Sequence, residues 1–573
     1  MEKSFRPWDK SVLYQVYPWS FNEDEQRQPQ LGNGSIKGMT EKLPYLVDLG
    51  VDAVWVSPPY QGPMRDAGYD ISDFKSIHES LGTMEDFDEF VAECHVNGVR
   101  VMLDFIPNHS SDQHEWFQKS VNREPGYEDY YVWHSGKTDE HGNLIYGDDG
   151  RPLVPNNWGS VFSKPNKVKR LNGEMPWLND DDLTPPVPAW KWNEERQQYY
   201  LHMFIDSQPD LNWKNENVAR EMVDAMRFWI DKGVDGFRVD AFNHLAKDYS
   251  FPDEPLNPDY NESYDNPFDQ LILQSSSNYM PMYRDVLLQF CSLAREYNAR
   301  GREIKFIVES YVNSELLAEI NAIAPDVATA FNFEAFREPW NASVRKEQLD
   351  RYYREIGADN IPNQVNGNHD NTRLATRLGH AARAAHVMNL LLPGLRVVYS
   401  GEELGLTDGH VPVERAQDLN GYRDGARTPV PWDNSAPNAG FSDAPEQDLW
   451  LPVNEKDLDI AVNMQQGDSK SMLNLTKSTI RLCRLYDSLE NGDYEPVSGS
   501  NDENVLVYAR AHKDNRMYVA VNFSDAWQMT KVDGARGRVV LSSDTVQDDL
   551  EARGRVDSVF HLAPNEQIAV VAE

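Results

Sequence analysis

Cysteine is scarce in this 573-residue chain, and long apolar runs are missing. The three cysteines, Cys94, Cys291 and Cys483, lie far apart, so the sequence holds neither a disulfide framework nor the paired spacing of a zinc site. No run of about 18 apolar residues predicts a membrane span. Residues 1–10 are charged and lack the apolar stretch of a secretory leader. We therefore expect a cytoplasmic protein.

Basic residues are also few. The chain has 55 of them against 92 acidic residues, and its formal net charge is −37. This charge argues against nucleic acid or an anionic membrane as a partner. The acids are scattered rather than clustered, which indicates a solvated acidic surface and not a cation site. Hydrophobic residues make up 40% of the chain, enough for a large core.

Strand-like and helix-like segments alternate along most of the chain. The strand segments are short and apolar without clean alternation, which is typical of parallel strands covered on both faces. Eight strand–helix repeats predict an α/β fold, a (β/α)8 TIM barrel. The expected strands are 12–18, 52–57, 99–106, 236–241, 305–309, 328–333, 362–366 and 395–400. The expected helices are 36–49, 84–97, 218–232, 279–298, 314–322, 346–356, 381–392 and 472–489.

Two regions break this rhythm. Residues 107–207 are rich in Trp, Asn, Asp, Gly and Pro and too long for a loop, so we expect an irregular inserted B domain after the third strand. Beyond residue 491 short alternating segments predict a C-terminal all-β sandwich domain, 491–573. The catalytic barrel would then comprise residues 1–106 and 208–490.

Acids, histidines and an arginine gather at the C-terminal ends of the expected barrel strands, where such a fold holds its functional side chains. An Arg–Asp pair on one strand can be purely structural, but acids at several strand ends favour a functional cluster. No close His/Cys/Asp spacing indicates a metal, and we expect no cofactor. Paired carboxylates in a cleft are typical of glycoside hydrolysis. The residues are Asp104, Asn108 and His109 (third strand), Arg238 and Asp240 (fourth), Glu309 (fifth), and His369 and Asp370 (seventh).

At these residues the chain resembles the α-amylase superfamily, glycoside hydrolase family thirteen, in the α-glucosidase and oligo-1,6-glucosidase branch. Each short motif is weak alone, but four in the family's order are specific, and the resemblance covers nearly the whole chain. A fifth motif, QPDLN at 208–212, looks like the α-glucosidase form. The four motifs are DFIPNH at 104–109, GFRVD at 236–240, IVES at 307–310 and NHDN at 368–371.

The resemblance implies a retaining mechanism with three carboxylates. Asp240 would attack the anomeric carbon and form a glycosyl-enzyme. Glu309 would protonate the leaving oxygen and later activate water. Asp370 would stabilise the distorted sugar.

The same resemblance assigns substrate contacts. Arg238 would hold Asp240, and His109 and His369 would bind hydroxyls of the glucose at the cleavage site. Tyr69 would stack on the sugar ring, and Asp66 would bind the hydroxyls at the non-reducing end. The alternative for Asp66 is a turn residue before a glycine.

The segment 423–429 resembles the part of the family that supplies an arginine to Asp66. Arg427 is our first choice for that partner and Arg423 the second. Such an ion pair would close the pocket behind one glucose and so produce exo action.

Ala241, directly after the expected nucleophile, bears on linkage. In the branch that the chain resembles, this position tends to be valine in enzymes that cut α-1,6 links and a small residue in those that cut α-1,4 links. A stiff β-branched side chain would crowd the leaving sugar of an α-1,4 glucoside. Ala241 therefore favours α-1,4 preference, unless it is simply a small core residue.

The loop at 22–35 departs from the family, because it lacks the alternating acids of a cation-binding loop. We therefore predict no ion there.

Together these features predict an exo-acting α-glucosidase that releases glucose from short α-1,4-glucosides such as maltose, with a small oligosaccharide as its partner. A transglucosylase or isomerase, such as a trehalose synthase or sucrose-converting enzyme, is one alternative, although Gln208 stands where trehalose synthases would have methionine. An oligo-1,6-glucosidase is another. A non-catalytic transporter heavy chain shares the fold, but it would carry a membrane span and lack the intact carboxylates.

Overall fold

The computed structural model describes residues 4–26, 29–161, 188–255, 280–312, 314–337, 339–357, 359–418, 423–544, 550 and 554–573. Part of the predicted inserted region, 162–187, lies outside these residues.

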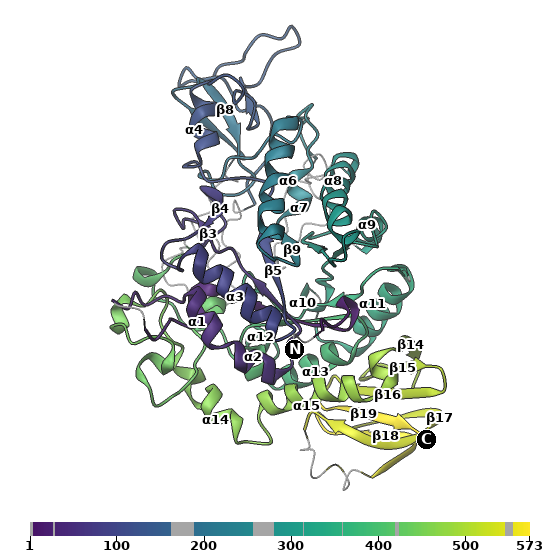
Figure 1. Cartoon of the computed structure of the whole chain (residues 1–573). Helices are drawn as coiled ribbons and strands as arrows, with labels where there is room; N and C mark the ends of the chain where they lie inside the picture. The colour runs from purple at the N-terminus through teal and green to yellow at the C-terminus, as the bar shows by residue number, and fades with distance from the viewer. Residues whose placement is uncertain are drawn as a thin grey trace.

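A parallel eight-stranded sheet forms the centre of the molecule (Figure 1). Its spatial order follows the chain, which is the order of a (β/α)8 barrel and confirms the predicted fold class. All seven strand pairings are parallel. The strands are β1 (Val12–Val16), β2 (Ala53–Val56), β5 (Arg100–Phe105), β9 (Gly236–Val239), β10 (Lys305–Val308), β11 (Ala328–Ala330), β12 (Asn363–Gln364) and β13 (Leu395–Tyr399).

A side chain closes the barrel between β11 and β12, the two ends of the sheet. Asn363 Nδ2 donates to Ala330 O at 2.9 Å, and Asn363 Oδ1 accepts from Asn332 N at 2.9 Å. The buried amide thereby replaces strand ladder bonds at this seam.

Alternate strand residues build two cores. Leu13, Trp55 and Met102 point into the barrel, whereas neighbours such as Tyr14 and Val54 pack outward beneath the helices. Burial on both faces explains why the strands are apolar without alternation.

The helices surround the sheet, and most of their positions agree with the predicted ones. The expected helix 36–49 is split, since Pro44 lacks the N–H that would continue it. A capping box of Thr83 and Asp86 begins α3. The main barrel helices are α1 (Ile36–Glu41), α2 (Leu43–Leu49), α3 (Met84–Val96), α6 (Glu216–Asp231), α8 (Met280–Asn298), α9 (Ser314–Asn321), α11 (Ala342–Glu355), α13 (Ala382–Leu391) and α15 (Met472–Leu485).

The inserted region and the C-terminal region lie at opposite ends of the molecule (Figure 1). Within the predicted insertion, β6 (Trp133–His134), β8 (Gln198–Leu201) and β7 (Trp190–Asn193) form an antiparallel sheet. Its aromatic core includes Trp158 and Trp190. The limits of the domains stay a prediction.

The C-terminal region is all-β, as predicted, but its strands join in one antiparallel sheet where we expected a sandwich of two sheets. The fifteen-residue β17 pairs with β18 and β19, and its register shifts along both pairings. One face of the sheet packs against α13 and α15, and the other has its own apolar cluster. The strands are β14 (Asp493–Val497), β15 (Val505–His512), β16 (Asn515–Asn522), β17 (Gln528–Ser542), β18 (Arg555–Leu562) and β19 (Gln567–Ala572).

Across the described residues, every helix is too short or too polar to span a bilayer.

Candidate active site

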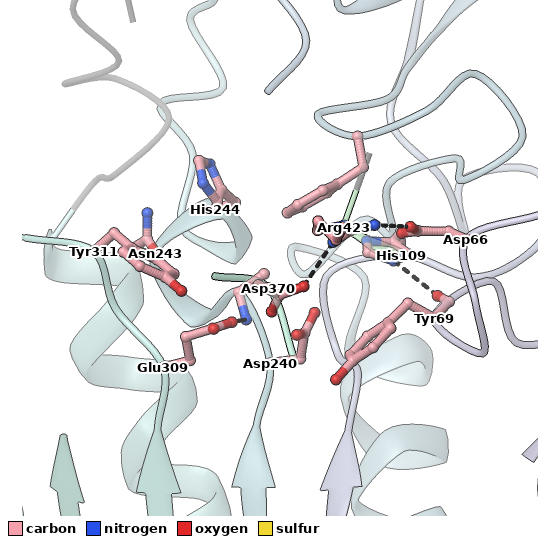
Figure 2. A pocket seen from close by; sticks show the side chains of 12 residues that line it. Asp66, Tyr69, His109, Asp240, Asn243, His244, Glu309, Tyr311, Asp370 and Arg423 are labelled. Carbon is pink, nitrogen blue, oxygen red and sulfur yellow. Dashed lines mark hydrogen bonds and ion pairs between the residues drawn. The ribbon is translucent and has the colours of Figure 1, made fainter. Parts of the chain in front are cut away.

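A pocket opens at the C-terminal ends of the barrel strands. Its walls come from segments that are distant in sequence, and Figure 2 shows three carboxylates turned toward its centre. The lining residues are Asp66, Tyr69, His109, Phe204, Asp240, Ala241, Asn243, His244, Glu309, Tyr311, Asp370 and Arg423.

Arg238, on β9, binds three carboxylates beneath the pocket. Its Nη1 donates to Asp104 Oδ1 at 2.7 Å and to Asp240 Oδ1 at 2.6 Å, and its Nη2 forms an ion pair with Glu309. The guanidinium is fully buried, so it orients these groups without itself lining the pocket. This geometry agrees with the predicted role of Arg238 as the residue that holds Asp240.

Ala241 links the two expected catalytic acids through its backbone. Its φ of 43° lies in the left-handed region, which is unusual for a residue with a side chain. In this conformation its N–H donates to Glu309 Oε2 at 3.0 Å. The strained turn after β9 therefore holds Glu309 next to Asp240.

Burial dominates the ionisation of the cluster. It raises the pKa of Asp240 well above the usual range; Arg238 lowers that pKa, whereas Glu309 and Asp104 raise it further. Burial also raises the pKa of Asp104, to about 6. Three carboxyl groups share one guanidinium, so the cluster favours retaining a proton near neutral pH.

Asp370 behaves in the opposite way. Burial alone would raise the pKa of its carboxyl, but His369, Arg423 and Arg427 together bring it below its ordinary value. Asp370 Oδ1 accepts from Arg423 Nη1 at 2.7 Å and from Arg427 Nη2 at 3.0 Å. The site thus combines one firmly ionised carboxylate with a cluster that can hold a proton.

Arg423 closes one end of the pocket. Its Nη2 donates to Asp66 Oδ1 at 2.6 Å, and Asp66 Oδ2 accepts from Gln208 Nε2 at 2.8 Å. Arg423 Nε donates to Asp418 Oδ2 at 2.6 Å. Our first choice of Arg427 as the partner of Asp66 was wrong, because Arg427 lies deeper, where its Nε donates to His369 O at 2.8 Å.

Of the predicted aromatic and histidine residues, two line the pocket and one lies behind the lining. Tyr69 and His109 line the pocket. His369 is fully buried, stacked on the Tyr69 ring at 5.2 Å between centroids, and its Nε2 is hydrogen-bonded to Tyr69 Oη at 2.6 Å. Like Arg238 and Arg427, it is absent from the lining and supports the wall from behind.

His109 is a neutral imidazole, since burial lowers its pKa to about 3. Its Nδ1 is hydrogen-bonded to Asn108 Nδ2 at 3.1 Å and its Nε2 to Tyr69 O at 3.1 Å. These bonds fix the ring orientation.

Four lining residues were not predicted from the sequence: Phe204, Asn243, His244 and Tyr311. Asn243 and His244 belong to α7 (Phe242–Leu245), a short helix directly after the Asp240–Ala241 turn. Their closeness to Asp240 in the sequence is the feature from which they could have been predicted. They and Tyr311 lie on the Glu309 side of Figure 2, opposite Asp66 and His109.

In the described part of the chain, no group of three or more His, Cys, Asp or Glu is arranged so that it could hold a metal ion.

A barrel whose strand ends carry an Arg-held carboxylate, a second carboxylate bound to the same arginine, and a third paired with arginines defines a glycoside hydrolase. The sequence profile described as "Alpha amylase, catalytic domain" matches residues 15–492. The chain belongs to this alpha-amylase family of glycoside hydrolases.

Its relatives include several named glucosidases. An alpha-glucosidase of Apis mellifera is 34% identical over 540 residues, covering 90% of this chain and 85% of the relative. Maltase A2 of Drosophila melanogaster is 35% identical, covering 91% and 87%. Oligo-1,6-glucosidase of Heyndrickxia coagulans is 32% identical, covering 90% and 92%.

Solved structures similar to this chain include a glucosyl transfer enzyme and a sugar synthase. An alpha-glucosyl transfer enzyme has a TM-score of 0.82 at 29% identity, covering 99% of both chains. A trehalulose synthase mutant has a TM-score of 0.80 at 27% identity, covering 99% of this chain and all of the other.

Proposed function

We propose that this protein is a retaining, exo-acting α-glucosidase that releases glucose from the non-reducing end of short α-1,4-glucosides such as maltose. The observation that carries the proposal is the Asp66–Arg423 ion pair, which closes the pocket opposite Glu309. A blind end leaves room for one terminal sugar, so cleavage would remove one glucose at a time. The alpha-glucosidase and maltase relatives support the same activity.

In the proposed mechanism the terminal glucose lies over Asp240. Arg238 binds Asp240 Oδ1, so Oδ2 would attack the anomeric carbon and form the glycosyl-enzyme. Glu309 would pass a proton to the leaving oxygen. Glu309 would then take a proton from water as the water attacks the intermediate, and Asp240 would leave.

Asp370 would stabilise the positive charge that develops on the sugar ring. Its neighbouring arginines keep it ionised, and a fixed charge of this kind costs no reorganisation during the reaction. Asp66 and His109 would bind hydroxyls of the same ring, and Tyr69 would pack against it.

The α-1,4 preference rests on Ala241, whose small side chain lines the pocket next to Asp240. Oligo-1,6-glucosidase activity is the alternative on that point. The cytoplasmic location expected from the sequence stays a proposal.

Glucosyl transfer or isomerisation is the second candidate, and the similarity to the transfer enzyme and to the trehalulose synthase favours it. The same glycosyl-enzyme would form, but a sugar would replace water as the acceptor.

Product analysis on maltose, isomaltose, sucrose and trehalose tests the proposal. Free glucose from maltose as the main early product is the expected result. If new disaccharides were the main product, with little free glucose, the activity would be transfer or isomerisation and not hydrolysis. Faster cleavage of isomaltose would replace only the linkage assignment.

A further inference from the structure

A buried lysine, Lys247, lies two residues beyond α7, outside the pocket. Both its side chain and that of Asp210 are fully inaccessible, and Lys247 Nζ lies 3.0 Å from Asp210 Oδ2. Nζ also donates to Asn108 Oδ1 at 2.9 Å and to His244 O at 2.7 Å. A buried ammonium needs such a full set of acceptors, since desolvation is costly.

The acceptors of Lys247 come from three separate segments, and each adjoins a residue that shapes the pocket. Asn108 directly precedes His109. Asp210 lies two residues after Gln208, whose side chain donates a hydrogen bond to Asp66. The third acceptor is the backbone of His244, itself a lining residue.

The first two segments are already joined to each other. Leu211 N donates to Asn108 O at 2.9 Å, and His109 and Asp210 form an antiparallel bridge. Asp210 Oδ1 also accepts from Asn108 Nδ2 and from Met203 N, each at 3.1 Å. This pair of segments is therefore a firm support independent of Lys247.

The third segment, α7, is packed into the core by the side chains of Phe242 and Leu245. It has only four residues, and a single helical turn is marginal without outside contacts. Its N-terminus is tied to β10, where Phe242 N donates to Glu309 O at 3.1 Å. At its other end Lys247 returns to His244 O and joins it to the firm pair.

The His244 ring lies on the Glu309 side of the pocket (Figure 2) and packs edge-on against Phe204 at 5.4 Å between centroids. In the proposed mechanism the leaving oxygen and the sugar attached to it lie on this side, because Glu309 protonates that oxygen. The terminal glucose lies on the other side, with Asp66 and His109.

We propose that Lys247 is a positioning residue for the leaving-group side of the pocket. Its ammonium holds the His244 backbone against the Asn108–Asp210 support and so fixes the wall that binds the second sugar of the substrate or an acceptor sugar. This inference rests on the proposed function and concerns the affinity for the second sugar, not the chemical step on the first.

The test must separate positioning from folding. Lys247→Met alone leaves Asp210 buried without its partner, which is strongly destabilising. The double variant Lys247→Met/Asp210→Asn removes both charges, and the amide oxygen can still accept from Met203 N. We expect the double variant to melt within about 5 °C of the wild type.

We expect the double variant to raise KM for maltose about tenfold. Inhibition by 1-deoxynojirimycin, a single-ring glucose mimic that needs no second-sugar contact, should stay within about twofold of the wild type. The share of transfer products at high maltose should fall, because an acceptor sugar binds the same wall. If Lys247 had a purely structural role, the double variant would keep the wild-type KM for maltose as well as the wild-type stability.

Two further variants complete the experiment. Asp210→Asn alone also breaks the buried ion pair and should lower the melting temperature. Burial already lowers the pKa of Lys247, so the neutral amine can stay in place and donate to His244 O, and the folded protein should keep KM for maltose within about twofold of the wild type. This comparison also tests the inference if the double variant does not fold. Lys214→Met removes an exposed lysine that lies over the Tyr249 ring, and it should change neither constant.

Any one of three results would overturn the inference. The folded double variant could keep the wild-type KM for maltose, or it could lose maltose and inhibitor binding equally. Asp210→Asn could raise KM for maltose to the level of the double variant. A wild type that releases glucose from none of the α-glucosides would instead refute the proposed function, before any variant is compared.

Discussion

Removing the Asp66 carboxylate should damage capture of the terminal glucose far more than it damages the fold. Asp66 is 4% exposed, and each of its oxygens accepts one hydrogen bond, from Arg423 and from Gln208. Loss of a buried, charge-assisted contact to the sugar should cost ~2–4 kcal/mol of transition-state binding. At 1.36 kcal/mol per tenfold, Asp66→Ala should lower kcat/KM on maltose about 30- to 900-fold.

The fold should survive this change, since Arg423 keeps its bonds to Asp370 and Asp418. Initial rates of glucose release over a range of maltose concentrations give kcat/KM, and thermal unfolding gives the stability. Asp112→Asn is the matched control, because it breaks the more exposed ion pair of Asp112 with Arg65, the residue next to Asp66, and such pairs contribute ~0–1 kcal/mol. An unchanged kcat/KM for Asp66→Ala would remove Asp66 from the pocket and with it the argument for exo action.

Three further predictions follow from the site and its surroundings. Asp240→Asn and Glu309→Gln should each leave a folded protein that has lost ~10²–10⁴-fold or more in kcat on maltose; a Glu309→Gln variant with more than about a tenth of wild-type kcat would refute its role as the acid. Ala241→Val should lower the ratio of the maltose to the isomaltose cleavage rate, by a factor that corresponds to ~1–3 kcal/mol. A β-branched residue at φ 43° also reduces stability, so both rates are measured on the same protein sample, where any loss of folded protein cancels in the ratio. An unchanged ratio would assign Ala241 to packing alone. Burial raises the pKa of Glu402 from 4.5 to about 8, so between these pH values the folded state keeps a proton that the unfolded chain releases. The stability that goes with the protonated carboxyl is fully present below the lower value and is lost as pH rises through about 8. Glu402→Gln should therefore stabilise the protein by ~1–4 kcal/mol more at pH 8.5 than at pH 4.5 in denaturant unfolding; an equal effect at both pH values would contradict the shifted pKa.

The barrel could be predicted from the sequence because its strands and helices are each a local pattern. Apolar strands, helices ended by glycine and regular spacing are properties of neighbouring residues. β14 was not predicted, because Pro496 and two acids interrupt any alternation. It lies at the edge of its sheet, where proline is tolerated.

The three carboxylates were also within reach of the sequence, since each follows the end of a barrel strand. The choice between Arg423 and Arg427 was not. Arg423 directly precedes the short turn η7 (Asp424–Arg427), and Arg427 is its last residue. Only the packing of that turn decides which guanidinium meets Asp66, which lies 357 positions from Arg423 along the chain. The positions of Phe204, His244 and Tyr311 in the pocket lining likewise depend on how three separate segments of the chain meet, which no local pattern encodes.

In the proposed mechanism Asp240 attacks the sugar, and Glu309 first supplies a proton to the leaving oxygen and then takes one from water. Two displacements at one carbon retain its configuration, whereas a single attack by water inverts it. Proton NMR spectra recorded during the first minutes of maltose cleavage, before mutarotation mixes the anomers, show which form of glucose leaves the non-reducing end. Attack by Asp240 followed by attack of water should release α-glucose first from that end; β-glucose would mean a single attack by water and would exclude Asp240 as the nucleophile.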